Sequence, residues 1–395
     1  METISGISIK HILQNNNNWQ HFYNKHQSLI REDIVWNIEK LFSCRTNLGF
    51  HKYICLDCGH TVTVPHTCKS RICSTCGTAA TDNWIASSLN DFIDVPYQHI
   101  VFSMPSSIST LILFNRKLLL NIIFKCVRKT ILPCTTDRNK NPYTPGFIIV
   151  LHTFGRDIKF NCHFHILITC GGLSLDKSKW LPNFYIPHDA MKKIWRYQVI
   201  NSLRGLFKKG VLRLPDCKEF SAYTSFNKYL DNLYSKTWYV NLGKSLKDAS
   251  FTVRYIGRYT KRPVIAETRI TSYDGHFVRF FFKDLAANKT LYPKFTVEQF
   301  IARFIRHIPD KHFRQIRYAG IFASRVKTSL TGIARKLLNR ARKKAIKILT
   351  WRERRFKSRG SDPLTCPNCL KEMLLCSIVY APALVQMKST SCHYP

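Results

Sequence analysis

Acidic side chains are scarce in this sequence. Among its 395 residues, 24 are Asp or Glu and 61 are Lys or Arg, so the formal net charge is +37 and the pI is about 9.9. A charge of this size calls for a polyanionic partner, and nucleic acid is the natural candidate. Hydrophobic residues still make up 45% of the chain, which is enough to build two or three domains and excludes disorder of the whole chain.

Long apolar runs are also missing. No stretch approaches the roughly 18 consecutive apolar residues of a membrane-spanning helix, and the N-terminus has no amphipathic anchor, so we expect no membrane partner. Residues 1–18 lack the basic region and apolar core of a secretory signal, which predicts a protein that stays inside the cell. In a reducing compartment, the 15 cysteines are better explained as metal ligands than as disulfides.

Six of the cysteines lie within residues 44–76, and four of them form two Cys-x-x-Cys pairs separated by fourteen residues. This spacing is typical of a zinc ribbon or a treble clef, in which four thiolates surround one Zn²⁺ tetrahedrally. We therefore predict a structural zinc held by Cys55, Cys58, Cys73 and Cys76. Further candidate ligands in the same window are Cys44, Cys68 and His66.

The cysteine module also carries positive charge, notably on Lys69 and Arg71. A closed four-thiolate zinc site has no open coordination position for chemistry. We therefore expect the module to grip DNA through these two side chains rather than to catalyse a reaction.

The chain after residue 95 is predicted to be α+β, because short β-rich apolar runs alternate with helical patterns. Strands are expected at residues 98–104, 146–153 and 163–169. Helices are expected at residues 111–132, 190–209 and 249–262. A hairpin at 268–284 should turn at Asp274 and Gly275, and a capping box of Thr296 and Gln299 should begin a helix that ends near residue 308.

The segment 325–359 concentrates the basic charge, with fourteen Lys or Arg and a single acid. Its apolar residues recur at helical spacing, so the segment is predicted to be helical. A solvated charged helix would explain this composition, but contact with a nucleic-acid backbone is the favoured interpretation. Beyond it, Cys366 and Cys369 are typical of half a zinc knuckle, and the tail after Cys376 offers no second half.

Residues 161–169 alternate as a β-strand does. The alternation places His163 and His165 on one face, opposite the side chains of Phe164, Ile166 and Ile168. The two imidazoles then converge on one point and could seat Mg²⁺ or Mn²⁺, although a pair of this kind is more often structural when taken alone. His152 and His99 are both open as the third ligand, and either could instead orient another ligand.

Tyr255 and Tyr259 lie four residues apart on the helix predicted at 249–262, so both phenols share one face. Such a pair is also typical of an aromatic ridge in a core. The surrounding charge favours a catalytic interpretation, because the same helix carries four cations suited to phosphate: Arg254, Arg258, Lys261 and Arg262. A phenol with a pKa of about 10 is a weak nucleophile at neutral pH, and nearby cations favour the phenolate.

Together these segments resemble the HUH superfamily of single-strand nucleases, and more closely the two-tyrosine rolling-circle transposases of the insertion-sequence-ninety-one family. The likeness covers most of the chain and follows the order of that family's motifs, from the cysteine module through residues 95–105, 151–155, 162–174, 238–243 and 254–262. One departure is Asn161-Cys162, where the family usually has His-Pro before the histidine pair. The surroundings of the metal ligands should therefore differ from the family pattern.

The resemblance implies a central antiparallel sheet of HUH type flanked by helices, with an N-terminal zinc-binding module and a basic helical C-terminal region. The corresponding domains would be residues 1–95, 96–320 and 321–395. The enzyme would attack single-stranded DNA at transposon ends with a tyrosine, leaving a 5′-phosphotyrosine and a free 3′-hydroxyl. Its cofactors would be structural Zn²⁺ and catalytic Mg²⁺ or Mn²⁺, and its place the bacterial cytoplasm, associated with the nucleoid.

Two other functions remain open. A plasmid rolling-circle replication initiator or relaxase would run the same chemistry, and a zinc-dependent DNA-binding regulator would run none. The cysteine module and the sequence of the tyrosine helix weigh against an initiator. Formation of a covalent DNA adduct would separate an enzyme from a regulator.

Overall fold

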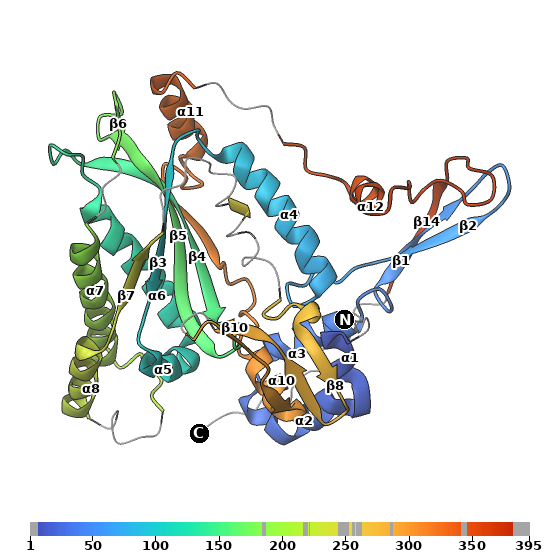
Figure 1. The fold of residues 1–395 in the computed structure, drawn as a ribbon, viewed down its shortest axis with the longest axis horizontal. Coiled ribbons are helices and arrows are strands. Elements are labelled where there is room, and N and C mark those ends of the chain that lie inside the picture. Colours follow the sequence, from blue (N-terminus) through green and yellow to red (C-terminus); the bar gives the residue numbers. More distant parts are fainter. Residues whose placement is uncertain are drawn as a thin grey trace.

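The computed structural model describes residues 7–183, 187–215, 220, 222–243, 253–254, 257, 263–284, 287–340 and 346–381. Its largest element is an antiparallel sheet in the order β13-β4-β5-β3-β7, with the short β6 paired to β5 (Figure 1). The strands are β3 Tyr97–Ser103, β4 Tyr143–Phe154, β5 Phe160–Ser174, β6 Trp180–Leu181, β7 Tyr239–Leu242 and β13 Ile316–Gly320. The three strands predicted from the sequence and the antiparallel central sheet are confirmed.

One face of this sheet is covered by helices. They are α5 Ser109–Phe114, α6 Arg116–Ile131, α7 His188–Lys208 and α8 Tyr223–Ser235, all on one side of the sheet in Figure 1. Phe164, Ile166 and Ile168 are buried in the core between the sheet and these helices. The apolar face predicted for this strand is therefore the one that the helices cover. The helix predicted at 111–132 is broken at Asn115, whose backbone leaves helical geometry and whose side-chain amide donates to the carbonyls of Leu111 and Arg213.

The opposite face carries α4 Ser74–Asp91 and α11 Lys327–Leu337 (Figure 1). A second core forms there from Val150 and Leu167 of the sheet, Phe92 after α4 and Ala334 of α11. Because side chains alternate along a strand, this face also receives the histidines of β5.

A third core joins segments far apart in the chain. The helices α1 Ile9–Gln14, α2 Asn18–His26 and α3 Glu32–Phe42 pack with α10 Val297–Ile305 and the sheet of β8 Ile270–Tyr273, β9 Phe277–Phe280 and β12 Lys294–Thr296. The predicted turn at Asp274 and Gly275 joins β8 to β9, and Gly275 has the positive φ of 93° that favours glycine. The capping box is confirmed. Thr296 Oγ1 accepts from the backbone N–H of Gln299 at 3.2 Å, and Gln299 Oε1 accepts from the backbone N–H of Thr296 at 3.1 Å.

A smaller sheet stands apart at one end of the molecule. Its strands are β1 Gly49–Ile54, β2 Thr61–Pro65 and β14 Leu374–Tyr380, in the order β14-β1-β2, so the C-terminal strand pairs with the N-terminal hairpin (Figure 1). The remaining regular elements are α12 Trp351–Arg359, the pair β10 Phe282–Asp284 and β11 Lys289–Leu291, and the short 3-10 turns η1 Asn15–Asn17, η2 Gln27–Leu29, η3 Ser106–Ile108, η4 Leu132–Cys134 and η6 Glu267–Arg269.

The prediction of helix throughout segment 325–359 is wrong for residues 346–350. The segment forms two helices, α11 and α12. Thr350 starts the second one as an N-cap, because its side chain accepts from the Glu353 amide in a capping box that the apolar spacing did not reveal. Among the described residues, no helix is both long and apolar enough to cross a membrane.

Candidate active site and metal centres

Three histidines converge on the face of the central sheet that faces α4. His163 and His165 lie on β5, and His152 lies on β4 directly opposite His163. One nitrogen from each ring lies within 4.8 Å of the others, the spacing of ligands around a single metal ion. The predicted convergence of His163 and His165 is therefore present, and the neighbouring strand adds His152 to it.

His99 occupies a different position. It lies on β3, two residues before the partner of His165, and its Nε2 is 2.9 Å from His165 Nδ1 with the two rings stacked at 5.1 Å. His163 donates from Nδ1 to the Asn161 carbonyl at 2.9 Å, which leaves its Nε2 as the atom suited to bind a metal. Two residues were left open as the third ligand. The structure groups His152 with His163 and His165, whereas His99 is hydrogen-bonded to His165 and lies outside the group.

Burial sets the charge of this cluster. It lowers the pKa of His152 and His165 well below the usual 6.5, and the charges of neighbouring imidazoles lower both further. Burial also lowers the pKa of His163 and outweighs the Asn161 carbonyl, which raises it. The three rings are neutral at pH 7, the protonation state that binds a metal.

The tyrosine segment is only partly described. Tyr255 and Tyr259 lie outside the described residues, as do Arg258, Lys261 and Arg262, whereas Arg254 is described and exposed. Val253 is fully buried in the core on the histidine face. Gly257 lies against α4 so closely that a Cβ there would sit 2.6 Å from Cγ1 of Ile85. The described residues on either side of Tyr255 therefore rest between α4 and the face that carries the histidines.

The cysteines form two clusters, and this corrects the single zinc site expected from the sequence. Cys73 and Cys76 group with the two cysteines that had been only further candidates, Cys44 and Cys68. The Sγ atom of Cys76 lies 3.8 Å from that of Cys44 and 3.6 Å from that of Cys68. The other expected pair, Cys55 and Cys58, groups with Cys366 and Cys369.

The hairpin β1–β2 is the physical reason for this division. Its five paired positions, from Phe50–Pro65 to Ile54–Thr61, place Cys55 and Cys58 at the tip. At about 3.3 Å per residue, the tip stands roughly 16 Å from the base, where Cys68 follows the second strand. Four thiolates of one zinc must lie within a few ångströms, so the two pairs cannot share an ion. Each group of four thiols matches a closed tetrahedral zinc site.

Arg71 was expected to grip DNA from the cysteine module, but the structure places it inward. It lies on the loop between Cys68 and Cys73, and its Nη1 atom is buried. Burial, with help from the charge of Arg116, lowers the pKa of Arg71 to about 10. The charge of Arg71 is one cause of the low pKa of His152. The loop of the first cysteine cluster therefore brings the Arg71 guanidinium near the histidines. Lys69 is exposed, as expected.

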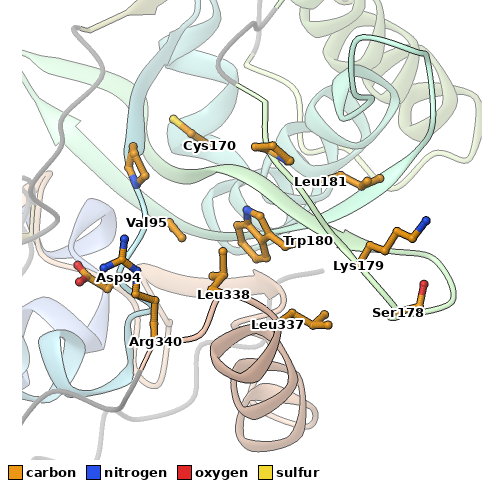
Figure 2. A pocket seen from close by; sticks show the side chains of 12 residues that line it. Asp94, Val95, Cys170, Ser178, Lys179, Trp180, Leu181, Leu337, Leu338 and Arg340 are labelled. Atoms are coloured by element: carbon orange, nitrogen blue, oxygen red, sulfur yellow. The ribbon is translucent and has the colours of Figure 1, made fainter.

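A pocket of about 610 Å³ lies elsewhere, between the end of β5 and α11. Figure 2 shows Trp180, Lys179 and Arg340 among the side chains around it. Its one residue on β5, Cys170, follows His165 by five positions, which is roughly 16 Å along the strand. The pocket is therefore separate from the histidine cluster.

Comparison with known proteins gives matches over most of the chain. Residues 146–329 match a family model described as "Putative transposase", and residues 14–104 match one described as "Transposase zinc-binding domain". The transposase for insertion sequence element IS801 of Pseudomonas savastanoi is 30% identical over 322 residues, which are 80% of this chain and 77% of that protein. "Putative transposase y4qJ" of Sinorhizobium fredii is 27% identical over 335 residues, 82% of this chain and 84% of that protein. No solved structure matches the chain significantly.

Proposed function

This chain belongs to the insertion-sequence-ninety-one (IS91) family of transposases, and we propose that it cuts and rejoins single-stranded DNA through a 5′-phosphotyrosine during rolling-circle transposition. A transposase in general cuts and transfers DNA strands. The observation that carries the more specific proposal is the group of His152, His163 and His165, on the same face of the sheet as the core that contains Val253, two residues before Tyr255 in the sequence. The net charge of +37 suits the DNA partner.

The donor set of the cluster fits a divalent ion. Three neutral imidazoles within 4.8 Å of one another would hold it, with His99 and the Asn161 carbonyl fixing the orientation of two of the rings. Such an ion withdraws charge from the scissile phosphate. Because Mg²⁺ prefers oxygen ligands and imidazole is a softer donor, Mn²⁺ suits these residues better.

The nucleophile in this proposal is the phenolate oxygen of Tyr255 or Tyr259. It forms a bond to phosphorus while the bond from phosphorus to the 3′-oxygen breaks, and that oxygen takes up a proton to become the free 3′-hydroxyl. The energy of the phosphodiester is kept in the tyrosyl ester, so rejoining needs no ATP. The second tyrosine can receive the second strand.

Cations would assist this step from two sides. Arg254, Arg258, Lys261 and Arg262 flank the tyrosines in sequence and favour the phenolate over the neutral phenol. On the other side, Arg71 brings a buried positive charge to the histidines. A phosphate bound at the histidines would be attracted to this charge.

The finer architecture follows from the same proposal. The antiparallel sheet with paired histidines on a central strand would be the HUH-type sheet, and residues 1–95, 96–320 and 321–395 would be the zinc-binding, catalytic and basic C-terminal regions. The DNA would be single-stranded at transposon ends, and the protein would act at the bacterial nucleoid. A replication initiator would share the chemistry, but one of the two relatives is named as a transposase and the other as a putative transposase. A regulator without activity would not need the three-histidine cluster.

A covalent-adduct assay tests the proposal. The protein is incubated with an end-labelled oligonucleotide carrying a transposon end and with Mn²⁺, then run on a denaturing gel. Wild type should give a protein-linked band and Tyr255→Phe/Tyr259→Phe should give none, while both bind the DNA equally in a filter assay. His163→Ala/His165→Ala should also lose the band. Adducts that persist in the double tyrosine variant would contradict the tyrosine assignment.

A further inference from the structure

The second cysteine cluster is built by the two ends of the chain. Cys55 and Cys58 come from the tip of the β1–β2 hairpin, and Cys366 and Cys369 come from the loop before β14. The Sγ atoms of Cys55 and Cys369 lie 3.3 Å apart although 314 residues separate them, and Cys58 lies 3.5 Å from both Cys366 and Cys369. The four thiols are close enough to surround one ion.

The two halves of this cluster have the same backbone. In the first, the Cys55 amide donates to the His60 carbonyl and the Gly59 amide donates to the Cys55 carbonyl, both at 2.9 Å. In the second, the Cys366 amide donates to the Lys371 carbonyl at 2.8 Å and the Leu370 amide to the Cys366 carbonyl at 3.0 Å.

The position after each second cysteine is also left-handed in both halves, with φ of 72° at Gly59 and 61° at Leu370. The left-handed conformation is unfavourable for leucine. Its presence at Leu370, the position equivalent to Gly59, therefore indicates that contacts outside the turn set this conformation. Two turns of this form, facing each other, make the pair of knuckles found in zinc ribbons.

The sheet attached to these knuckles cannot hold itself together by burial. All seven residues of β14 are exposed, and the core below the knuckles consists of three buried residues, Cys55, Cys366 and Met373. Very small folds of this kind usually need a metal or a disulfide. The pairing itself is specific, because Gly49 faces Tyr380 in the ladder and a Cβ at position 49 would clash with the Val379 carbonyl.

We propose that Cys55, Cys58, Cys366 and Cys369 bind a second structural zinc ion, and that this ion closes a ribbon between the two ends of the chain and so holds residues 346–359 beside α4. The inference goes beyond the proposed strand-transfer reaction and does not depend on it. The first cluster, Cys44, Cys68, Cys73 and Cys76, holds its own ion, so the full chain binds two.

The interactions between the basic segment and α4 show why such a closure matters. Lys327 pairs with Asp91 at the end of the helix at 2.5 Å, Ile346 exchanges hydrogen bonds with Asn90, and Arg354 donates to Asn83 at 2.9 Å. Residues 346–354 thus run antiparallel to α4, and the chain continues from α12 toward β14 (Figure 1). α11 is held by the core around Ala334, whereas residues 346–354 meet α4 through these polar surface interactions. Interactions of this kind contribute little stability, so an anchor at the far end is needed to keep residues 346–359 in place.

Zinc content tests the site directly. The purified full chain should contain two zinc ions, and Cys366→Ser/Cys369→Ser should contain one. Cys376→Ser is the matched control, because Cys376 lies exposed on β14 outside both clusters, and it should keep two. A double variant that retains the zinc content of wild type would overturn the proposal.

A measurement on the unaltered protein covers the case in which the double variant fails to fold. Free thiols are alkylated before and after treatment with a chelator, and the modified peptides are identified by mass spectrometry. Cys366 and Cys369 should be protected until zinc is removed, while Cys376 should react in both states. Equal reaction of all three cysteines in the untreated protein would show that no ion is bound there.

Limited trypsin digestion tests the closure of the basic segment. In Cys366→Ser/Cys369→Ser, cleavage within residues 346–357 should be at least tenfold faster than in Cys376→Ser, because the segment no longer has its anchor. An unchanged rate in a double variant that binds one zinc ion would show that the second ion does not hold the segment.

Discussion

At the residue scale, the histidine cluster shows how pairing between strands completes a set of ligands. His163 and His165 are two residues apart on one strand, so their shared face follows from local geometry. His152 joins them because β4 pairs with β5 in the register that sets it opposite His163. His99 lies on the other neighbouring strand, β3, and is hydrogen-bonded to His165. The roles of these residues should differ in measurable ways.

The first prediction compares His152 with His99. His152→Ala removes a ligand and should abolish detectable Mn²⁺ binding, whereas His99→Ala removes only the group that orients His165 and should weaken it about 10- to 100-fold. His99→Gln keeps a hydrogen-bonding side chain and should restore part of the affinity. Calorimetric titration with Mn²⁺ measures all three. Equal effects of His152→Ala and His99→Ala would mean that the two residues act alike.

The second prediction concerns Gly257, which packs against Ile85 of α4. Gly257→Val should displace the adjacent tyrosines and reduce covalent adduct formation by about 10- to 100-fold, since misplacement of a reacting group by an ångström has effects of that size. DNA binding should be retained. Gly205→Ala on α7 is the control, because nothing lies within 4 Å of a Cβ there. Full activity in Gly257→Val would show that the close approach to α4 is not needed.

The third prediction concerns pH. Burial lowers the pKa of His307 to about 3, although the Ile158 carbonyl partly opposes this, and in the unfolded chain the pKa is about 6.5. Below pH 6.5 His307 is protonated in the unfolded chain but stays neutral in the folded protein. The free energy of unfolding therefore falls by up to about 1.4 kcal/mol per pH unit until pH 3.

Urea denaturation of wild type and His307→Gln between pH 7 and pH 4 measures this decrease. The other buried histidines are present in both proteins, so the difference between the two slopes isolates His307. The variant should lose less stability per pH unit on acidification. Parallel slopes would contradict the assignment.

At the element scale, two helices begin with the same capping motif but differ in how they pack against the rest of the protein. The capping box at Thr296 begins α10, whose residues Phe300, Ile301 and Phe304 are fully buried in the core shared with the N-terminal helices. The capping box at Thr350 begins α12, which has no residue in any of the described cores. The same local motif therefore has different consequences in the two places.

The fourth prediction follows from that difference. Thr296→Ala should lower the free energy of unfolding by about 1 kcal/mol, because it removes the cap from a helix that belongs to the core. Thr350→Ala should leave global unfolding nearly unchanged and affect only α12. Chemical denaturation of the two variants provides the comparison. A larger effect from Thr350 than from Thr296 would contradict it.

At the scale of the whole molecule, charge is distributed unevenly around the sheet. α11 and α12 lie on the same side as the histidines, near α4, whereas the basic residues of α7 lie on the opposite face. A strand bound at the histidines should therefore meet the first group and not the second.

The fifth prediction tests this with two matched sets of exposed cations. Replacing Lys336, Arg340 and Lys357 with Gln should reduce the slope of log K against log salt for single-stranded DNA by about 2, or about 0.7 for each phosphate that is no longer neutralised. Replacing Lys192, Lys193 and Lys209 on the far face should leave the slope nearly unchanged. Filter binding over a salt series measures both. Equal changes in the two sets would indicate DNA binding without a preferred face.

The sequence by itself determined the features that depend on near neighbours. Alternation along 161–169 set the two faces of β5, the pair Thr296 and Gln299 set a helix start, and the order of motifs identified the family. The positions of Tyr255 and Tyr259 relative to the histidines stay a prediction.

Only the tertiary structure decided which distant residues meet. The spacing of Cys55, Cys58, Cys73 and Cys76 suggested one zinc site. The β1–β2 hairpin instead holds the two pairs apart, and each pair groups with two other cysteines. The partners of Cys55 lie more than 300 residues away, and no local pattern encodes a contact over that distance. Likewise Arg71, an ordinary basic residue in the sequence, becomes a buried cation beside His152 because the loop between Cys68 and Cys73 turns it inward. Local geometry follows from local sequence, but ligand sets that join distant strands follow from how the whole chain packs.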